Sequence, residues 1–331
     1  MRGVLVREFG PLDTHEIVEL PTPSIGPDEV LIDVHAIGLN FPDTLMPQGK
    51  YQTRPDLPFT PGRDAAGVVI ATGDAVTRCK VGDRVSAQVT WGAIAEQLAA
   101  PQARVFVLPD EVDFASAAAM LTAHNTAYVA VMLRGEVKST DTVLVTGASG
   151  GVGLAIVELA KAQGARLLAG ATSKAKADLA MDHGADAWID LSADDLHNSL
   201  KAQVAEATDG KLCNVVFDVV GGSVFDAAMR CVAYRGRMVI VGFATLNISM
   251  PKGHHILLKN ISVTGAPLDI HFKNEPETMY RGVDMIFDLF KQGKVRPHIM
   301  ETRPLDDVMG GLQRISDGNV TGKIVITTGR D

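Results

Sequence analysis

The feature that most constrains the fold is an alternation of short apolar runs and amphipathic stretches between Asp141 and Ala266. Six runs rich in β-branched residues have the length of buried strands. Most of the stretches between them carry apolar residues three and four positions apart, as helices do. Strands that alternate with helices form a parallel sheet covered on both faces, and six strands match a doubly wound sheet. The six runs are TVLVTGA (142–148), RLLAGAT (166–172), AWIDL (187–191), NVVFDVV (214–220), RMVIVGF (237–243) and ISVTGAP (261–267).

A glycine-rich turn follows the first of these runs. In TGASGGVG (146–153) the turn glycines are Gly147, Gly150 or its neighbour Gly151, and Gly153. Backbone amides at a helix start favour a pyrophosphate, and glycine lets the phosphate come close. Because the turn opens a βα series, the sequence predicts a dinucleotide site.

The first 110 residues have a different pattern, in which strand-like runs are separated by turns rich in Pro, Gly and Asp. This pattern indicates a compact antiparallel β domain. A helical stretch then leads into the parallel sheet, and the last elements lack the alternation that would extend that sheet, so we expect them to return to the first domain. The predicted domains are 1–120, 121–266 and the return 267–331. The strand-like runs are 2–9, 29–39, 65–73, 83–89 and 322–328, and the helical stretches are 114–133, 276–293 and 305–318.

Composition excludes several classes of partner. Lys plus Arg number 31 against 39 Asp plus Glu, a net charge of −8, and no basic run offers a surface for nucleic acid. No apolar stretch approaches the roughly 20 residues that span a bilayer, and the charged N-terminus shows no signal-peptide core. Cys79, Cys213 and Cys231 are scattered, which suits a reducing compartment and gives no metal or disulfide framework. We therefore expect a cytoplasmic protein without membrane or nucleic-acid partners.

Short-chain dehydrogenases carry a similar glycine turn, but they pair it with a Tyr-x-x-x-Lys motif, in which the lysine lowers the pKa of the tyrosine. Those enzymes place the turn near the chain start, whereas here it begins only at Gly147. None of the four tyrosines has a lysine four residues later; those positions hold Pro55, Met132, Met238 and Asp284. This family is therefore excluded.

The chain instead resembles the medium-chain dehydrogenase/reductase superfamily, and within it the zinc-free quinone reductases of the zeta-crystallin group. The resemblance covers essentially the whole chain and implies an α/β fold, with a GroES-like β-rich catalytic domain plus a Rossmann doubly wound parallel sheet. It also implies a homodimer joined through the last strand of that sheet, NISVTGA (260–266), whose apolar edge is an open template for pairing. The motifs that carry the resemblance are 38–69, 140–161, 218–243, LLKNISVTGA (257–266) and GKIVI (322–326).

Zinc alcohol dehydrogenases of the same superfamily hold their metal on Cys, His and Cys. The matching positions here are Asn40, Arg63 (followed by Asp64) and about Thr122. An amide, a guanidinium and a hydroxyl do not build that site, so we expect no zinc. Without a Lewis acid, hydride transfer needs an acceptor that is already electron-poor, such as a quinone or an α,β-unsaturated carbonyl.

Four polar residues are the catalytic candidates: Asn40, Asp43, Tyr51 and Arg63. The resemblance places Asn40 and Asp43 beside the nicotinamide and Tyr51 at the substrate mouth. Structural alternatives stay open, namely a helix cap for Asp43, a packed ring for Tyr51 and a local ion pair for Arg63. Leu45 stands where many quinone reductases have a second tyrosine.

The cofactor is predicted to be NADPH. The second strand ends at Gly170–Thr172, without the acidic residue that binds the ribose 2′-hydroxyl in NAD enzymes, and lysines follow at once. The resemblance assigns Lys176 to the 2′-phosphate, although Leu191 replaces a tyrosine that some relatives use there. The predicted cofactor-binding residues are Asn40, Thr126, Ser149, Gly150, Gly151, Val152, Ser173, Lys174, Lys176, Gly242 and Phe243.

The sequence thus predicts an NADPH-dependent reductase of a small electrophilic substrate, with two alternatives. One is an enoyl-thioester reductase of the acryloyl-CoA type, which would need Lys50, Arg54 and Lys273 to converge on the substrate arm. The other is a non-catalytic NADPH-binding scaffold, since zeta-crystallin relatives serve as lens proteins.

Overall fold

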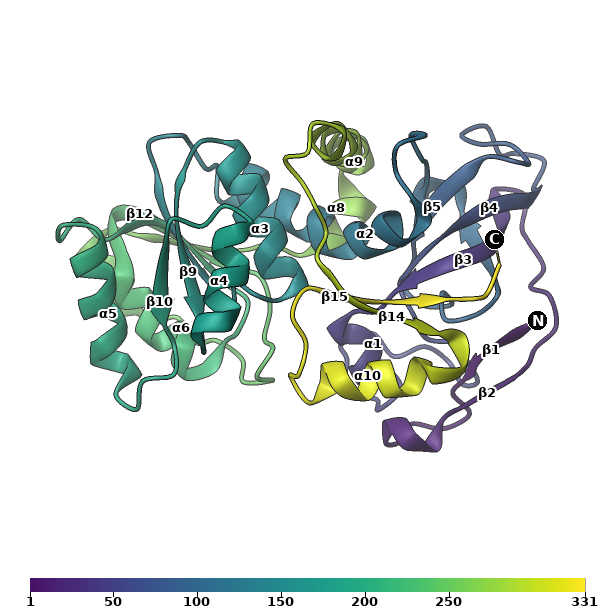
Figure 1. Ribbon diagram of the computed structural model, residues 1–331, viewed down its shortest axis with the longest axis horizontal. Helices are drawn as coiled ribbons and strands as arrows, with labels where there is room; N and C mark the ends of the chain where they lie inside the picture. Colours follow the sequence, from purple (N-terminus) through teal and green to yellow (C-terminus); the bar gives the residue numbers. More distant parts are fainter. Residues whose placement is uncertain (331) are drawn as a thin grey trace. The chain divides into compact units, whose positions relative to one another are not determined.

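The computed structural model describes residues 1–330, and the chain divides into two compact units (Figure 1). Unit 1 comprises Met1–Thr122 and Pro297–Asp331, and unit 2 comprises Ala123–Arg296. No helix in the described part of the chain combines the length and the apolarity that crossing a membrane requires.

Unit 2 is built on a six-stranded parallel sheet with the strand order β10-β9-β8-β11-β12-β13. All six predicted strands are present, and the order is that of two mononucleotide-binding halves. Figure 1 shows α3 and α4 on one side of this sheet and α5 and α6 on the other. The strands are β8 (Thr142–Thr146), β9 (Arg166–Ala171), β10 (Ala187–Asp190), β11 (Cys213–Asp218), β12 (Val232–Ile240) and β13 (Ser262–Gly265). The helices are α3 (Gly151–Ala162), α4 (Lys174–Asp182), α5 (Leu196–Ala207), α6 (Gly222–Ala228), α7 (Gly253–Lys259), α8 (Leu268–Asn274) and α9 (Pro276–Lys291).

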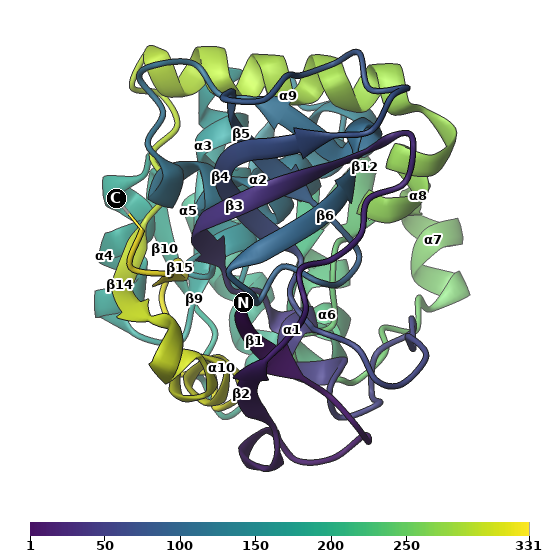
Figure 2. The ribbon, with the colours of Figure 1, turned by 90° about the vertical axis from the view of Figure 1, so that its right-hand side faces the viewer.

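Unit 1 contains a seven-stranded sheet, in which β14-β15-β3-β4-β5-β7 follow one another and β6 pairs with β3. Figure 2 shows β3, β4, β5 and β6 side by side. The strands are β3 (Glu29–Gly38), β4 (Asp64–Thr72), β5 (Arg84–Gln88), β6 (Gln97–Pro101), β7 (Val105–Val107), β14 (Ile299–Pro304) and β15 (Lys323–Thr327), with β1 (Arg2–Leu5) and β2 (Glu16–Glu19) in a separate pair. The helices are α1 (Phe41–Leu45), α10 (Val308–Ser316) and the first part of α2 (Phe114–Tyr128), up to Thr122. The rest of α2 belongs to unit 2 and is followed there by a π-helix, Val129–Arg134.

Gly38, at the end of β3, lets helix α2 pack directly on this sheet. A Cβ atom added at Gly38 would lie 2.0 Å from the carbonyl oxygen of Ala118. Only glycine therefore permits this approach of Ala118 and the first part of α2 to the end of β3.

The return to unit 1 comes later than predicted, at Pro297 rather than at residue 267. Helices α8 and α9 do not extend the parallel sheet, as expected, but they belong to unit 2. The reason is the apolar face of α9: a Cβ atom at Gly282 would lie 2.7 Å from the ring of Tyr128, so the helix packs closely on that ring. Strands β2, β6, β7 and β14 had not been predicted.

Candidate functional site

The glycine turn of unit 2 joins β8 to α3. Gly147 has a φ of +65°, and Gly150 caps α3 without any side-chain hydrogen bond. A Cβ atom at Gly153 would lie 2.2 Å from the carbonyl oxygen of Gly147, so glycine is needed for α3 to start this close to the turn. The uncapped start of a helix beside a glycine-lined turn fits a pyrophosphate.

The predicted cofactor residues of unit 2 come mainly from the carboxyl ends of its strands. One group follows β8, a second follows β9, and a third follows β12; β8 and β11 are neighbours whose crossovers run in opposite directions. This is the switch point at which doubly wound sheets bind dinucleotides. Ser149, Gly150, Gly151 and Val152 follow β8; Ser173, Lys174 and Lys176 follow β9; Gly242 and Phe243 follow β12; and Thr126 lies on α2.

The two lysines after β9 have different surroundings. The ammonium of Lys174 donates to both carboxylate oxygens of Asp178 at 2.7 Å. Lys176 has no ion-pair partner among the residues that the structure describes, and its backbone N–H is capped by the hydroxyl of Ser173. Lys176 is therefore the cation of this pair that remains available for a phosphate.

Unit 1 holds a buried polar cluster centred on Asp64, the first residue of β4. The Oδ2 atom of Asp64 accepts hydrogen bonds from Asn40 Nδ2 (2.9 Å) and from the backbone N–H of Thr122 (3.1 Å). Its Oδ1 atom accepts from the hydroxyl of Thr122 (2.7 Å). Strand pairing explains the meeting, since Asp64 is paired with Gly38 and Asn40 follows two residues later.

Lys323, the first residue of β15, completes this cluster. Its ammonium donates to Asn40 Oδ1 at 2.5 Å and lies 3.9 Å from Asp64 Oδ2. The side chain is buried, and burial lowers the pKa of Lys323 while Asp64 and Asp43 oppose that change. Asn40 also donates to the carbonyl oxygen of Gly38 at 3.0 Å, so both ends of its amide have partners.

Asp43 is fully buried on α1 beside this cluster. Its Oδ2 atom accepts the backbone N–H of Asn40 at 2.8 Å, whereas Oδ1 has no hydrogen-bond partner within the described chain. Burial, reinforced by the charge of Asp64, raises the pKa of Asp43 to about 7, although Arg63 and Lys323 favour the ionised form. The predicted capping role of Asp43 is present, and the carboxyl can also hold a proton near neutral pH.

The other two catalytic candidates lie in unit 1 as well. Tyr51 packs against Val6, Met46 and Phe59, as the packing alternative predicted. Arg63 is buried just before β4 and acts on Asp43 through its charge.

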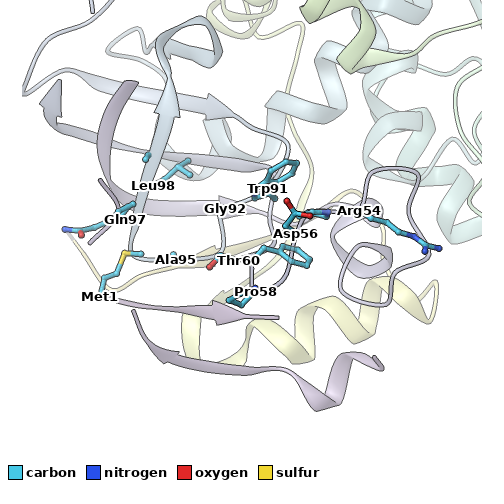
Figure 3. Close-up of a pocket in the computed structure, with 14 residues that line it drawn as sticks. Met1, Arg54, Asp56, Pro58, Thr60, Trp91, Gly92, Ala95, Gln97 and Leu98 are labelled. Carbon is cyan, nitrogen blue, oxygen red and sulfur yellow. The ribbon is translucent and has the colours of Figure 1, made fainter. Parts of the chain in front are cut away.

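A separate pocket of about 530 Å³ opens elsewhere in unit 1 (Figure 3). Trp91, Phe59 and Leu98 are among its apolar residues, and Arg54 extends away from Trp91 in this view. None of the four catalytic candidates lines this pocket. This pocket therefore does not bring the predicted catalytic residues together.

Sequence reasoning did not single out Lys323 and Asp218. Lys323 lies in the motif GKIVI (322–326), and its separation of 283 residues from Asn40 gives no sequence pattern that would link the two. Asp218, at the end of β11, accepts hydrogen bonds from the hydroxyl of Thr146 (2.6 Å) and from the backbone N–H of Gly221 (2.9 Å). It thereby ties the glycine turn to the neighbouring loop.

Comparison with known protein families gives two matches. Residues 26–110 match the alcohol dehydrogenase GroES-like domain, and residues 151–289 match the zinc-binding dehydrogenase domain. The name of the second domain implies zinc. In the polar cluster, however, Asn40 Oδ1 accepts from the ammonium of Lys323 and Asp64 accepts from the amide of Asn40, and the cluster contains no thiolate or imidazole ligand. Among the described residues no group of three His, Cys, Asp or Glu side chains could hold a metal ion. The donor set does not fit zinc.

Several relatives with similarity over almost the whole chain are oxidoreductases by name. The quinone oxidoreductase-like protein 2 homolog of Nematostella vectensis is 36% identical over 99% of this chain and 89% of its own length. The solved quinone oxidoreductase of Pseudomonas syringae pv. Tomato is 34% identical with a TM-score of 0.89, covering 98% of this chain and 99% of the other. That of Escherichia coli, complexed with NADPH, is 26% identical with a TM-score of 0.89, covering 99% and 100%. The chain therefore belongs to the quinone oxidoreductases of the medium-chain dehydrogenase/reductase superfamily, a family of oxidoreductases.

Proposed function

We propose that the protein is an NADPH-dependent, zinc-independent reductase that transfers a hydride to a quinone or to an α,β-unsaturated carbonyl. The observation that carries this proposal is the polar cluster of unit 1. There the ammonium of Lys323 and the side-chain amide of Asn40 lie next to Asp64, in place of side chains that could bind zinc. When bound, NADPH supplies the hydride, and the residues of the chain supply orientation and charge.

Unit 2 supports the choice of cofactor. The uncapped start of α3 offers backbone amides for the pyrophosphate, and Lys176 offers an ammonium for a 2′-phosphate. No acidic residue stands at the end of β9 (Gly170, Ala171) to repel that phosphate. The NADPH complex of the Escherichia coli relative points to the same cofactor.

Unit 1 supports the choice of acceptor. A quinone or an enone needs only hydrogen-bond donors and positive charge for the oxygen on which negative charge develops. The candidates are the hydroxyl of Tyr51 and the guanidinium of Arg63, while Asp43 can hold a proton at Oδ1 near neutral pH. Asn40 is a candidate for contact with the nicotinamide.

The test is an acceptor panel with NADPH, which includes phenanthrenequinone, an enone, acryloyl-CoA and a primary alcohol with NADP. We expect turnover of the quinone or the enone, no alcohol oxidation, no stoichiometric zinc by elemental analysis, and full activity after chelation. Turnover of acryloyl-CoA alone would favour the enoyl-thioester reductase. NADPH binding without any turnover would favour the scaffold, and activity lost to a chelator would refute zinc independence.

We also propose that the protein is a cytoplasmic homodimer joined through β13. This strand is at the edge of its sheet and pairs only with β12 among the described strands; on its outer side the side chain of Arg134 donates to the carbonyl oxygen of Gly265. Large apolar side chains of the preceding segment are mostly exposed: Ile248, Met250, Leu257 and Leu258. A twofold axis through β13 would cover both features. Light scattering should give twice the monomer mass at micromolar concentration; a monomer mass would refute the dimer.

A further inference from the structure

We propose that Lys323 is a positioning residue for hydride transfer: its buried ammonium holds the side-chain amide of Asn40 in one orientation and balances the carboxylates of Asp43 and Asp64. This inference rests on the proposed function, because it concerns the same site. It adds a residue that neither the glycine turn nor the four catalytic candidates would have indicated.

The register of the sheet places Lys323 beside Asn40. Strand β15 runs antiparallel to β3, with Val325 opposite Gly38, and the backbone N–H of Leu39 donates to the carbonyl oxygen of Ile324. The next residue on each strand toward the site is therefore Lys323 on one side and Asn40 on the other. Since the pairing is part of the central sheet, the ammonium is fixed by the fold and not by a mobile loop.

The hydrogen bonds of Asn40 show what the ammonium does. The two N–H groups of Nδ2 donate to Gly38 O and Asp64 Oδ2, and Oδ1 accepts from Lys323 Nζ. These three bonds fix both which end of the amide is oxygen and how the amide plane is turned. Without Lys323, Oδ1 has no hydrogen-bond donor among the described residues, and the amide is held only by the two bonds of its Nδ2 atom.

The charges around the site also depend on Lys323. The charged groups that face one another are Asp43 from α1, Arg63 from the segment before β4, Asp64 from β4 and Lys323 from β15, two of each sign. Helix α2 contributes the uncharged Thr122. Removal of the ammonium leaves two buried carboxyl groups with one cation, which favours the protonated form of Asp43.

The presence of a lysine here is not explained by stability. Replacing a buried set of charges by packed apolar side chains is often neutral or stabilising, so a fold alone does not require an ammonium at this position. The ammonium also has donor capacity beyond its one hydrogen bond to Asn40. A cation kept in a desolvated cluster beside the candidate residues is typical of a site that must hold charge in place for a reaction.

The experiment compares Lys323→Met, Lys323→Arg, Asp43→Asn and the double variant Lys323→Met/Asp43→Asn with the wild type. Lys80→Met, at an exposed lysine of the same unit, is the control for the loss of one positive charge. We would measure kcat and the KM for NADPH with phenanthrenequinone. The affinity of NADPH and the titration of the Asp43 carboxyl by ¹³C NMR would be measured without acceptor.

We expect Lys323→Met to lower kcat about tenfold to a hundredfold with little change in the KM for NADPH, as loss of orientation does. The pKa of Asp43 should rise by about one unit, because a nearby positive charge is lost. Lys323→Arg should recover part of kcat and most of the Asp43 titration. A purely structural role would lower stability without moving that titration.

A folded Lys323→Met protein with wild-type kcat and an unchanged Asp43 titration would overturn the proposal. If Lys323→Met does not fold, the charge-balanced double variant decides: a further tenfold loss of kcat relative to Asp43→Asn supports the positioning role, and an equal kcat overturns it. If the wild type reduces no acceptor, the proposed function fails, and the titration of Asp43 in the cofactor-free protein still decides whether Lys323 sets the charge.

Discussion

The glycine turn of unit 2 and the polar cluster of unit 1 are built in opposite ways. The turn from Gly147 to Gly153 offers backbone amides and works because side chains are absent. The cluster around Asp64 consists of side chains from separate strands, and its properties depend on their hydrogen bonds and charges. A site made of backbone is therefore sensitive to one added methyl group, whereas a site made of buried charges is sensitive to pH and to single charge changes.

The largest effect should come from adding a methyl group to the turn. In Gly153→Ala the new Cβ would lie 2.2 Å from Gly147 O and 2.8 Å from Ala148 Cα, both backbone atoms that cannot move aside cheaply. We expect NADPH affinity to fall at least about a hundredfold, which is about 2.7 kcal/mol, with a loss of stability of about 1–3 kcal/mol. Fluorescence titration and urea unfolding measure the two effects.

The control for this variant is Gly253→Ala, at the start of α7, where a Cβ atom meets nothing within 4 Å. It should bind NADPH like the wild type. If Gly153→Ala also binds NADPH normally, the turn does not hold the pyrophosphate.

The buried carboxyl of Asp43 beside the cluster should make the free energy of unfolding depend on pH. Burial raises the pKa of Asp43 to about 7 in the folded protein, against the ordinary value of 3.8 for this side chain. A raised folded pKa means that the stability contributed by protonated Asp43 is complete below about pH 4 and is lost as the pH rises through 7. Asparagine at this position does not titrate, so between pH 5 and pH 8 the wild type should lose about 2.5 kcal/mol relative to Asp43→Asn.

Urea unfolding at both pH values measures this difference, and Asp110→Asn, at an exposed carboxylate, is the control. A constant gap between wild type and Asp43→Asn across this range would show that Asp43 is ionised throughout.

The lysines after β9 test whether side chains supplement the backbone site. Lys176→Ala should weaken NADPH binding by about tenfold to over a hundredfold, or roughly 1.5–3 kcal/mol, and leave NADH almost unchanged, because only NADPH carries the 2′-phosphate. Lys174→Ala should have the smaller effect, since its ammonium is already paired with Asp178. Equal weakening of NADPH and NADH in Lys176→Ala, or a wild type that prefers NADH, would contradict the assignment.

The same contrast explains what the sequence could predict. The six parallel strands and the glycine turn were predicted correctly because they depend on local periodicity and spacing. Lys323 was missed because its partner Asn40 is 283 residues away and the contact exists only through the register of β15 on β3. The return at Pro297 was missed because α9 packs on Tyr128, a tertiary contact that helical periodicity does not specify.

The smallest effect should come from Tyr51. Like the residues of the polar cluster it would act through a side chain, but its ring is held by apolar packing on Val6, Met46 and Phe59 and not by charge. Tyr51→Phe keeps that packing and removes only the hydroxyl, so stability should stay within about 0.5 kcal/mol of the wild type. If the hydroxyl donates to the developing oxyanion, kcat should fall about tenfold to a hundredfold, or ~1.4–2.7 kcal/mol. Tyr234→Phe, at an exposed ring, is the matched control. An unchanged kcat with the quinone and with the enone would remove Tyr51 from the mechanism, and would leave Arg63 as the proposed donor to the developing oxyanion in unit 1.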